Sequence, residues 1–419
     1  PKSDWYVWAD PKPDGSPPNN WQAVFAGPSW TWDSRRSQYY FHNFLSSQPD
    51  LNLHNPDVQE AILDVATYWM DRGVDGVRLD AINFAMHDPQ LRDNPPAPFV
   101  GERPQRTFDL QRHVHNQSHP DIVLFLERLR GVFDRYGDRF SLAEIGGLDA
   151  FQEMLAFTSG GTRLNSAYSF DYLYADNLTA SLVRTASSNW PTDPDAGWPS
   201  WAFSNHDAPR CISRWHDGSD PHAFAKLVMQ LLITLRGNAI IYQGEELGLP
   251  QADVPFERLQ DPEALANWPQ TLGRDGARTP FPWQKTAPHA GFSSFNGDTW
   301  LPIDARHVPL AVDQQDDDPA SVLYYVRRML ALRRSAPALS RGDITFLDTP
   351  DMLVAFERSI DGARWLCVHN LSAETVDWVP DTMAGQVLLS TYPDHADAGD
   401  ARELPQIIRP FEGYVAELA

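Results

Sequence analysis

The chain has 419 residues, 42% of them hydrophobic, which is enough for one large α/β domain with a smaller module and excludes a disordered chain. Its net charge of −22 repels nucleic acid and anionic membranes and suits a soluble protein with a neutral or cationic ligand, although acidity also serves solubility or salt adaptation. Only two cysteines occur, at 211 and 367, which excludes a disulfide framework and a cysteine-rich metal site.

No run of about 18 apolar residues is present, so we expect no membrane span, and no signal peptide is visible. We therefore expect a cytoplasmic protein. The chain opens at Pro1-Lys2-Ser3-Asp4 without a methionine, which indicates a piece of a longer protein.

Residues 1–53 are rich in proline, glycine, asparagine and aromatic residues and show little periodicity, so we expect an irregular, loop-dominated subdomain. Tryptophan and tyrosine crowd this segment. Their flat rings stack on the C–H faces of sugars, yet ordinary packing explains such rings equally well.

A helix is expected after this segment, because Asn55 is a good N-cap and Pro56 suits the first helical position. Gly73 is expected to end it. Four apolar residues repeat at helical spacing and support this helix, namely Val58, Ile62, Val65 and Trp69.

Strands and helices alternate over the middle of the chain. We expect strands over 75–82, 141–145, 167–173, 201–204 and 239–242, helices over 120–136, 222–235 and 319–334 (the last capped by Asp318), and a long polar loop over 86–118. This alternation predicts a parallel sheet with covering helices, in which long loops at the carboxyl ends of the strands build the active site. From about residue 342, short alternating runs around Asp361-Gly362, a hairpin turn signal, predict a small antiparallel β module without helices.

Three acidic residues are expected at the ends of three of these strands. Arg78 and Asp80 lie two residues apart in the segment 76–81 and therefore point to the same side of a strand. The cation would favour an ionised carboxylate, which a nucleophile requires. An Arg–Asp pair of this kind can equally be structural.

The second and third acids lie in separate segments. Glu144 is flanked by apolar residues, which favours a carboxyl group that stays protonated and can protonate a leaving group, although it could simply reach water past the strand end. His206 and Asp207, after Asn205, could bind vicinal sugar hydroxyls or form a turn through a side-chain-to-backbone bond. Together the three acids favour a glycosidase that works by double displacement, for which two carboxyl groups lie about 5–5.5 Å apart.

Several motifs follow one another along the chain. Gly76–Asp80 resembles a nucleophile strand, Ala143-Glu144 an acid/base strand, and Asn205–Asp207 the motif of a third acid. On these motifs the chain resembles the α-amylase family of glycoside hydrolases, in the subgroup of oligo-1,6-glucosidases and α-glucosidases. The likeness runs from Asp4 to about Arg334, and further stretches typical of the subgroup are Gln48–Asn52, Ile241–Glu246 and Gly273–Pro280.

The resemblance implies a role for each matching residue. Asp80 would form a covalent glycosyl-enzyme, and Glu144 would protonate the leaving oxygen and then activate water. Asp207 would bind sugar hydroxyls and help to distort the ring. The other implied substrate contacts are Arg78 (holding Asp80), His206 (the same sugar), Arg274 (the terminal glucose), and Phe25 and Phe44 (the pocket wall).

The resemblance also implies the fold. We expect an α/β protein with a (β/α)8 TIM barrel, whose N-terminal strands 1–3 are missing from this chain, and a C-terminal antiparallel β-sandwich domain. Residues 1–53 would be the remainder of a loop-rich subdomain B, 54–341 would hold barrel strands 4–8, and 342–419 would form the C-terminal β domain. No cofactor and no metal ligand are expected, and a structural calcium or magnesium ion is expected only in the missing N-terminal part.

Residue 81, which follows the nucleophile, bears on linkage. In similar enzymes valine here accompanies α-1,6 cleavage, while alanine or threonine accompanies α-1,4 cleavage, so Ala81 favours the α-1,4 linkage. The physical reason would be that an unbranched side chain frees space beside the scissile bond.

The leading interpretation is a retaining, exo-acting α-glucosidase for maltose-like oligosaccharides, with transglucosylation as a side reaction. We expect a monomer or homodimer, without nucleic acid or membrane partners. A sucrose isomerase, a trehalulose-forming enzyme and an amylosucrase-like transferase are alternatives from the same family. A non-catalytic, transporter-associated relative is an alternative of another class, against which the presence of all three acids argues.

Overall fold

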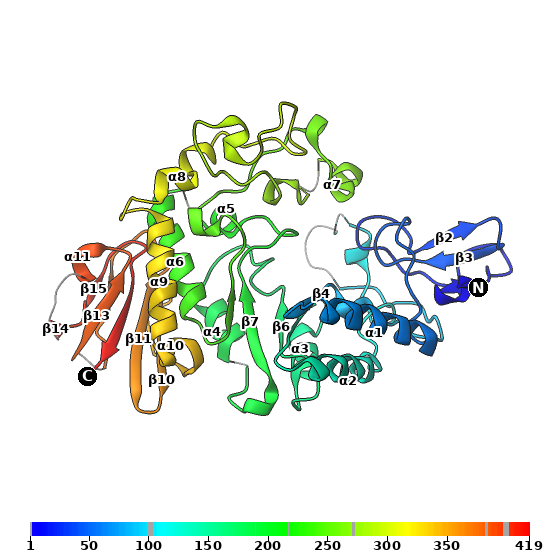
Figure 1. Cartoon of the computed structure of the whole chain (residues 1–419), viewed down its shortest axis with the longest axis horizontal. Helices are drawn as coiled ribbons and strands as arrows, with labels where there is room; N and C mark the ends of the chain where they lie inside the picture. The colour runs from blue at the N-terminus through cyan, green and yellow to red at the C-terminus, as the bar shows by residue number, and fades with distance from the viewer. Residues whose placement is uncertain are drawn as a thin grey trace. The chain divides into compact units, whose positions relative to one another are not determined.

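The computed structural model describes residues 2–98, 104, 106–188, 190–216, 218–269, 273–381, 384–396 and 402–419. They form two compact units, which are drawn in Figure 1. Unit 1 comprises Pro1–Phe170, Asp193–Trp198 and Asp261–Gly273, and unit 2 comprises Asp171–Thr192, Pro199–Gln260 and Arg274–Ala419. Among the described helices, none combines the length and the apolar character that a membrane crossing requires.

Unit 1 contains a parallel sheet covered by helices. Its strands β4 (Gly76–Leu79), β5 (Phe140–Ile145) and β6 (Ser166–Ser169) pair in that order. Position 76 favours glycine, because a Cβ atom there would collide with the carbonyl group of Phe140 on the neighbouring strand. The covering helices are α1 (Pro56–Asp71), α2 (Ile122–Phe133) and α3 (Ala150–Thr158), and α1 packs beside α2 (Figure 1).

The start of helix α1 is as predicted, and only part of its apolar surface is covered. The Asn55 side chain accepts a hydrogen bond from the backbone of Asp57, and Pro56 is the first helical residue. The buried residues are Val58, Leu63 and Met70. Val65 and Trp69, two of the apolar residues that repeat at helical spacing, are 54% and 49% exposed, because the helix is apolar on two sides and periodicity alone does not say which side is covered.

The N-terminal segment is less irregular than expected. Strands β1 (Trp8–Ala9), β2 (Trp30–Asp33) and β3 (Gln38–Phe41) form a small antiparallel sheet in the order β1-β3-β2. Buried Trp21, Trp30 and Phe41 pack under it, with the Trp21 and Trp30 rings stacked at 5.9 Å. Strands of two to four residues are too short for an alternation pattern to be visible.

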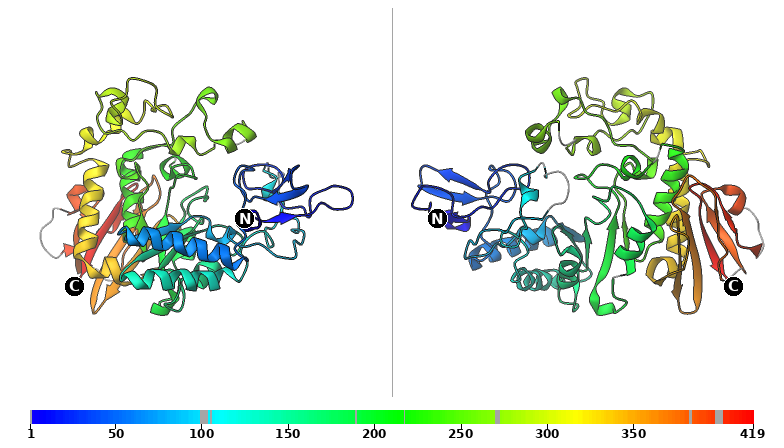
Figure 2. Two further views of the ribbon diagram at one scale, coloured as in Figure 1. Left: turned by 45° about the vertical axis from the view of Figure 1, so that its right-hand side comes forward. Right: turned by 180° about the vertical axis from the view of Figure 1, so that it is seen from behind.

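The parallel strands of unit 2 are β7 (Trp198–Ala202), whose first residue belongs to unit 1, and β8 (Asn238–Ile240). Helix α6 (Pro221–Thr234) forms the centre of the unit 2 core, since every residue from 224 to 234 is buried. It packs against α9 (Val322–Ser335), as Figures 1 and 2 show. The cap of α9 is Ser321, which accepts from the backbone of Tyr324; the expected cap, Asp318, instead accepts from the Ala320 backbone in the preceding turn.

The remaining helices are short. They are α4 (Ala180–Ser188), α5 (Cys211–Trp215), α7 (Pro262–Asn267), α8 (Val312–Gln315), α10 (Pro337–Arg341) and α11 (Pro393–Ala396). The single turn of α11 contradicts the expectation that no helix follows residue 342.

The C-terminal part of unit 2 is an antiparallel β domain. A six-stranded sheet has the order β14-β13-β16-β11-β10-β9, and β12 pairs with β15 in a second sheet. Asp361 and Gly362 both have positive φ (50° and 86°) and form the predicted hairpin turn between β10 and β11. The strands are β9 (Asp343–Phe346), β10 (Leu353–Ile360), β11 (Ala363–Asn370), β12 (Val376–Asp377), β13 (Ala384–Ser390), β14 (Arg402–Glu403), β15 (Ile407–Ile408) and β16 (Gly413–Leu418).

Candidate active site

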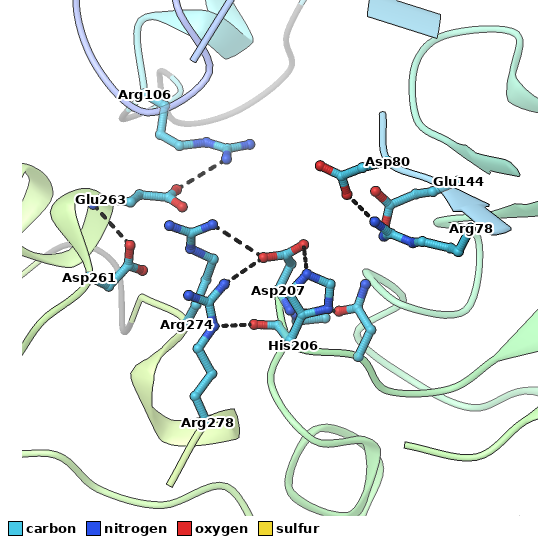
Figure 3. Close-up of polar contacts among 12 residues, drawn as sticks. Arg78, Asp80, Arg106, Glu144, His206, Asp207, Asp261, Glu263, Arg274 and Arg278 are labelled. Atoms are coloured by element: carbon cyan, nitrogen blue, oxygen red, sulfur yellow. Dashed lines mark hydrogen bonds and ion pairs between the residues drawn. The ribbon is translucent and has the colours of Figure 1, made fainter. Parts of the chain in front are cut away.

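In unit 1 a single guanidinium holds two of the expected acids (Figure 3). Arg78 lies on β4, and Asp80 follows the last residue of that strand. The Arg78 Nη1 atom forms a short ion pair with Asp80, and Nη2 lies 2.5 Å from Oε1 of Glu144 on β5. The two carboxyl groups therefore lie on the same side of the sheet, one guanidinium apart.

Tyr168 on β6 completes this cluster. It is the register partner of Glu144, accepts from Arg78 Nη2 at 2.9 Å and donates to Glu144 Oε1 at 2.8 Å. Burial and, next, the charge of Glu144 raise the pKa of Tyr168, so the phenol remains a donor at neutral pH. The Glu144 side chain thus receives two directed contacts that fix its orientation.

The two carboxyl groups have different surroundings. The Asp80 side chain is 72% exposed, while the Glu144 side chain is 4% exposed. Two carboxyl groups in such different environments can divide the roles of nucleophile and proton donor between them.

The segment after Asp80 bends sharply and leads to the expected aromatic residues. Ala81 has left-handed backbone angles (φ 41°, ψ 42°), which an L-residue other than glycine adopts at a cost of roughly 1–2 kcal/mol. The 3-10 helix η2 (Ile82–Phe84) follows. Its Phe84 ring lies 5.2 Å from that of Phe44, which in turn lies 5.7 Å from that of Phe25. The structure thus links Phe25 and Phe44 to the loop that carries Asp80.

In unit 2 the third acid contacts two arginines and a histidine (Figure 3). Asp207 Oδ1 accepts from Arg278 Nη2 at 2.7 Å and from Arg274 Nη1 at 3.2 Å, and Oδ2 lies 3.1 Å from His206 Nε2. The Asn205 Oδ1 atom accepts from the backbone of Asp207 at 2.8 Å, so the turn considered as an alternative is also present. The turn and the contacts of Asp207 with the two arginines are present together.

Sequence reasoning missed two members of these clusters. Tyr168 reaches Glu144 because the two residues are paired across strands β5 and β6, and nothing in the sequence indicated this pairing. Arg278 lies in the quoted stretch Gly273–Pro280, four residues after the predicted Arg274, and only the structure shows that both reach Asp207.

A buried carboxyl group supports the segment after β8. Glu245 is 1% exposed, and its carboxyl oxygens accept from the Tyr242 backbone at 2.8 Å and from the Cys211 thiol at 3.4 Å. Burial raises the pKa of Glu245 from 4.5 to about 7. Over the described residues, no group of three or more His, Cys, Asp or Glu side chains is arranged to hold a metal ion.

We predict that Glu245→Gln removes a pH dependence of stability. The folded state keeps the Glu245 proton between pH 4.5 and 7 while the unfolded chain releases it, so wild-type stability should fall by about 1.4 kcal/mol per pH unit over that window. Urea unfolding at several pH values should show the variant gaining on the wild type as the pH rises. An unchanged difference between the two proteins would contradict the prediction.

The sequence model of the α-amylase catalytic domain matches residues 1–342. The chain belongs to the α-amylase family. A probable α-glucosidase of Rhizobium meliloti (strain 1021) is 47% identical over 382 residues, which are 89% of this chain and 68% of that protein. An oligo-1,6-glucosidase of Heyndrickxia coagulans is 30% identical, over 99% of this chain and 78% of that protein.

Among solved structures, XgtA, described as an α-glucosyl transfer enzyme, matches this α-amylase family chain with a TM-score of 0.90 and 44% identity. The match covers 100% of this chain and 78% of XgtA. Together the relatives show a glycoside hydrolase of the α-glucosidase group. They also confirm the predicted fold, a (β/α)8 barrel with a C-terminal β domain, to which the parallel strand–helix segments and the antiparallel sheets conform.

Proposed function

We propose that this glycoside hydrolase is a retaining, exo-acting α-glucosidase that cleaves short oligosaccharides from the non-reducing end through a covalent glucosyl-enzyme. The observation that carries the proposal is the Arg78 guanidinium, which binds the exposed Asp80 carboxylate and the buried Glu144 carboxyl on one side of the sheet. Two carboxyl groups of one cluster are what double displacement requires.

In the first step, a carboxylate oxygen of Asp80 attacks the anomeric carbon of the terminal glucose, and the bond to the leaving oxygen breaks. Glu144 transfers its proton to that oxygen. In the second step, Glu144 takes a proton from water, the water oxygen attacks the anomeric carbon, and Asp80 is released as a carboxylate. Arg78 holds both carboxyl groups throughout, and Tyr168 orients Glu144. No step calls for a cofactor.

The proposal assigns recognition of the glucose hydroxyls to Asp207, with His206 and Arg274. An aspartate held by two arginines keeps its orientation, so it can accept hydrogen bonds from two hydroxyl groups with little reorganisation.

The decisive experiment traps the intermediate. A fluorinated α-glucosyl fluoride slows the second step more than the first, so the glucosyl-enzyme should accumulate. Peptide mass spectrometry should locate the label on Asp80. A label on another carboxylate, or none despite inactivation, would contradict the proposed nucleophile.

We propose α-1,4 as the preferred linkage because residue 81 is alanine. The names of the relatives do not decide the matter, since one is called an α-glucosidase and another an oligo-1,6-glucosidase. Ala81→Val should raise the rate on isomaltose relative to maltose. The total activity should fall as well, because a β-branched residue strains the left-handed backbone at this position. An unchanged isomaltose-to-maltose ratio would contradict the linkage proposal.

We also propose that a hydroxyl group of a second sugar molecule can replace water as the attacking group in the second step, which gives transglucosylation. The likeness to XgtA, described as an α-glucosyl transfer enzyme, supports this side reaction. Product analysis at high maltose concentration should show trisaccharides beside glucose; glucose alone at every concentration would contradict it.

A further inference from the structure

We infer that Arg210, together with Tyr242, is a positioning residue that holds Arg274 and Arg278 against Asp207. The inference rests on the proposed function, in which Asp207 recognises the sugar. It concerns unit 2 alone, and every contact that carries it lies there.

The two arginines that bind Asp207 come from the ends of one short element. Arg274 precedes and Arg278 follows the 3-10 helix η8 (Asp275–Ala277). Arg278 also donates from Nε to the His206 carbonyl at 2.7 Å. A shift of η8 would therefore move both guanidinium groups away from Asp207 together.

Two side chains hold the end of η8 through one atom. The Ala277 carbonyl accepts from Tyr242 Oη at 2.8 Å and from Arg210 Nη2 at 3.2 Å. Ala277 is the residue directly before Arg278, so its carbonyl fixes the peptide from which Arg278 departs. Gly276 fits here because a Cβ would collide with Gln251 and the Ala252 carbonyl.

Arg210 ties this carbonyl back to the loop of Asp207. It lies three residues after Asp207, and its own backbone N–H donates to Gln251 Oε1 at 2.9 Å. Its Nη1 atom donates to the Gln243 carbonyl at 2.7 Å, and its guanidinium lies 5.2 Å from the Tyr242 ring. These contacts close a ring. Asp207 binds Arg274 and Arg278, the Ala277 carbonyl beside Arg278 binds Arg210, and the backbone from Arg210 leads back to Asp207.

Arg210 is buried, and one of the carbonyl groups that it binds lies next to a residue that contacts Asp207. Arg210 is 2% exposed, and burial lowers its pKa. In the part of the chain that the structure describes, its guanidinium donates only to main-chain carbonyl groups. A buried cation bound in this way can stabilise a fold, but one of the two carbonyl groups that Arg210 binds belongs to Ala277, the residue directly before Arg278. The fork of donors on Arg210 is suited to fixing these two carbonyl groups at a set distance.

The test compares two variants with two matched controls. Tyr242→Phe removes one hydrogen bond to η8, and Arg210→Lys replaces the planar fork by a single ammonium. The controls make the same changes elsewhere in unit 2. Tyr392 Oη donates to the Pro410 carbonyl at 2.9 Å, and buried Arg358 donates to the carbonyl groups of Thr234, Leu339 and Gly342. The controls are therefore Tyr392→Phe and Arg358→Lys.

The readouts are kcat and KM on an aryl α-glucoside, the thermal midpoint, and the inhibition constant of 1-deoxynojirimycin, a cationic mimic of the transition state. We expect kcat/KM to fall about tenfold in Tyr242→Phe and roughly 100-fold in Arg210→Lys. The inhibition constant should rise by a similar factor, because transition-state mimics report the same positioning. The controls should lose thermal stability but keep kcat, KM and the inhibition constant within about twofold.

The inference is overturned if Tyr242→Phe and Arg210→Lys behave like their controls and lose only thermal stability. Should Arg210→Lys fail to fold, Tyr242→Phe decides alone. If the wild-type protein hydrolyses the glucoside and the two variants match their controls, the inference is refuted but the proposed function is not. A wild-type protein inactive on every α-glucoside would refute the proposed function, and the inference with it.

Discussion

Replacing Asp80 by alanine should lower kcat on an aryl α-glucoside by on the order of 10⁴-fold or more, because no other group can form the glucosyl-enzyme. The Asp80 side chain is 72% exposed and its one described ion pair is with Arg78, so the variant should fold like the wild type. Thermal unfolding checks that point before the kinetics are interpreted.

Added azide distinguishes the two acids. In Asp80→Ala, azide can enter the space that the carboxylate leaves and attack the anomeric carbon directly, so an activated α-glucoside should give β-glucosyl azide by a single inversion. In Glu144→Ala, Asp80 still forms the glucosyl-enzyme, and azide should attack it from the other face to give α-glucosyl azide. The same anomer from both variants, or no rescue in either, would contradict the assignment of roles.

Local chemistry allowed much of the fold to be predicted from the sequence. The Asn55 cap and the Asp361-Gly362 turn depend on residues that adjoin one another, and both form as predicted. The strands β4 and β5 lie where apolar runs between helices placed them, although β4 ends at Leu79 and leaves Asp80 in the following turn. That turn depends on the left-handed backbone conformation of Ala81, which an alanine in the sequence does not predict.

Features that depend on distant neighbours could not be predicted. The three-stranded sheet near the N-terminus pairs strands too short to show a pattern, and the covered side of α1 depends on what packs against it. In the candidate site, Asp80, Glu144 and Asp207 were found through motifs. Tyr168 and Arg278 were not, because each acquires its contact through strand register or a turn that brings separate segments together. The roles of all five remain predictions until the variants are measured.

The second large effect concerns stability. Arg358 on β10 is buried, and its guanidinium binds the carbonyl groups at the ends of two helices. Nη1 lies 2.5 Å from the carbonyl of Thr234, the last residue of α6, and 2.9 Å from that of Leu339 in α10, while Nη2 lies 2.8 Å from that of Gly342, the C-cap of α10. The last carbonyl groups of a helix have no partner within the helix, and a cation suits the negative end of the helix dipole.

Arg358→Met should therefore lower the free energy of unfolding by about 3–5 kcal/mol, since it leaves several buried carbonyl groups without donors at the junction of α6, α10 and the β domain. The matched control is Arg364→Met on the adjacent strand β11. Arg364 is 43% exposed and pairs with Glu357 at 2.6 Å, a surface contact worth about 0–1 kcal/mol. Denaturant unfolding measures both. Equal losses in the two variants would show that the junction does not depend on the capped helix ends. A large loss in Arg358→Met alone, with kcat unchanged in the folded fraction, would show that β10 stabilises this part of unit 2 through one side chain.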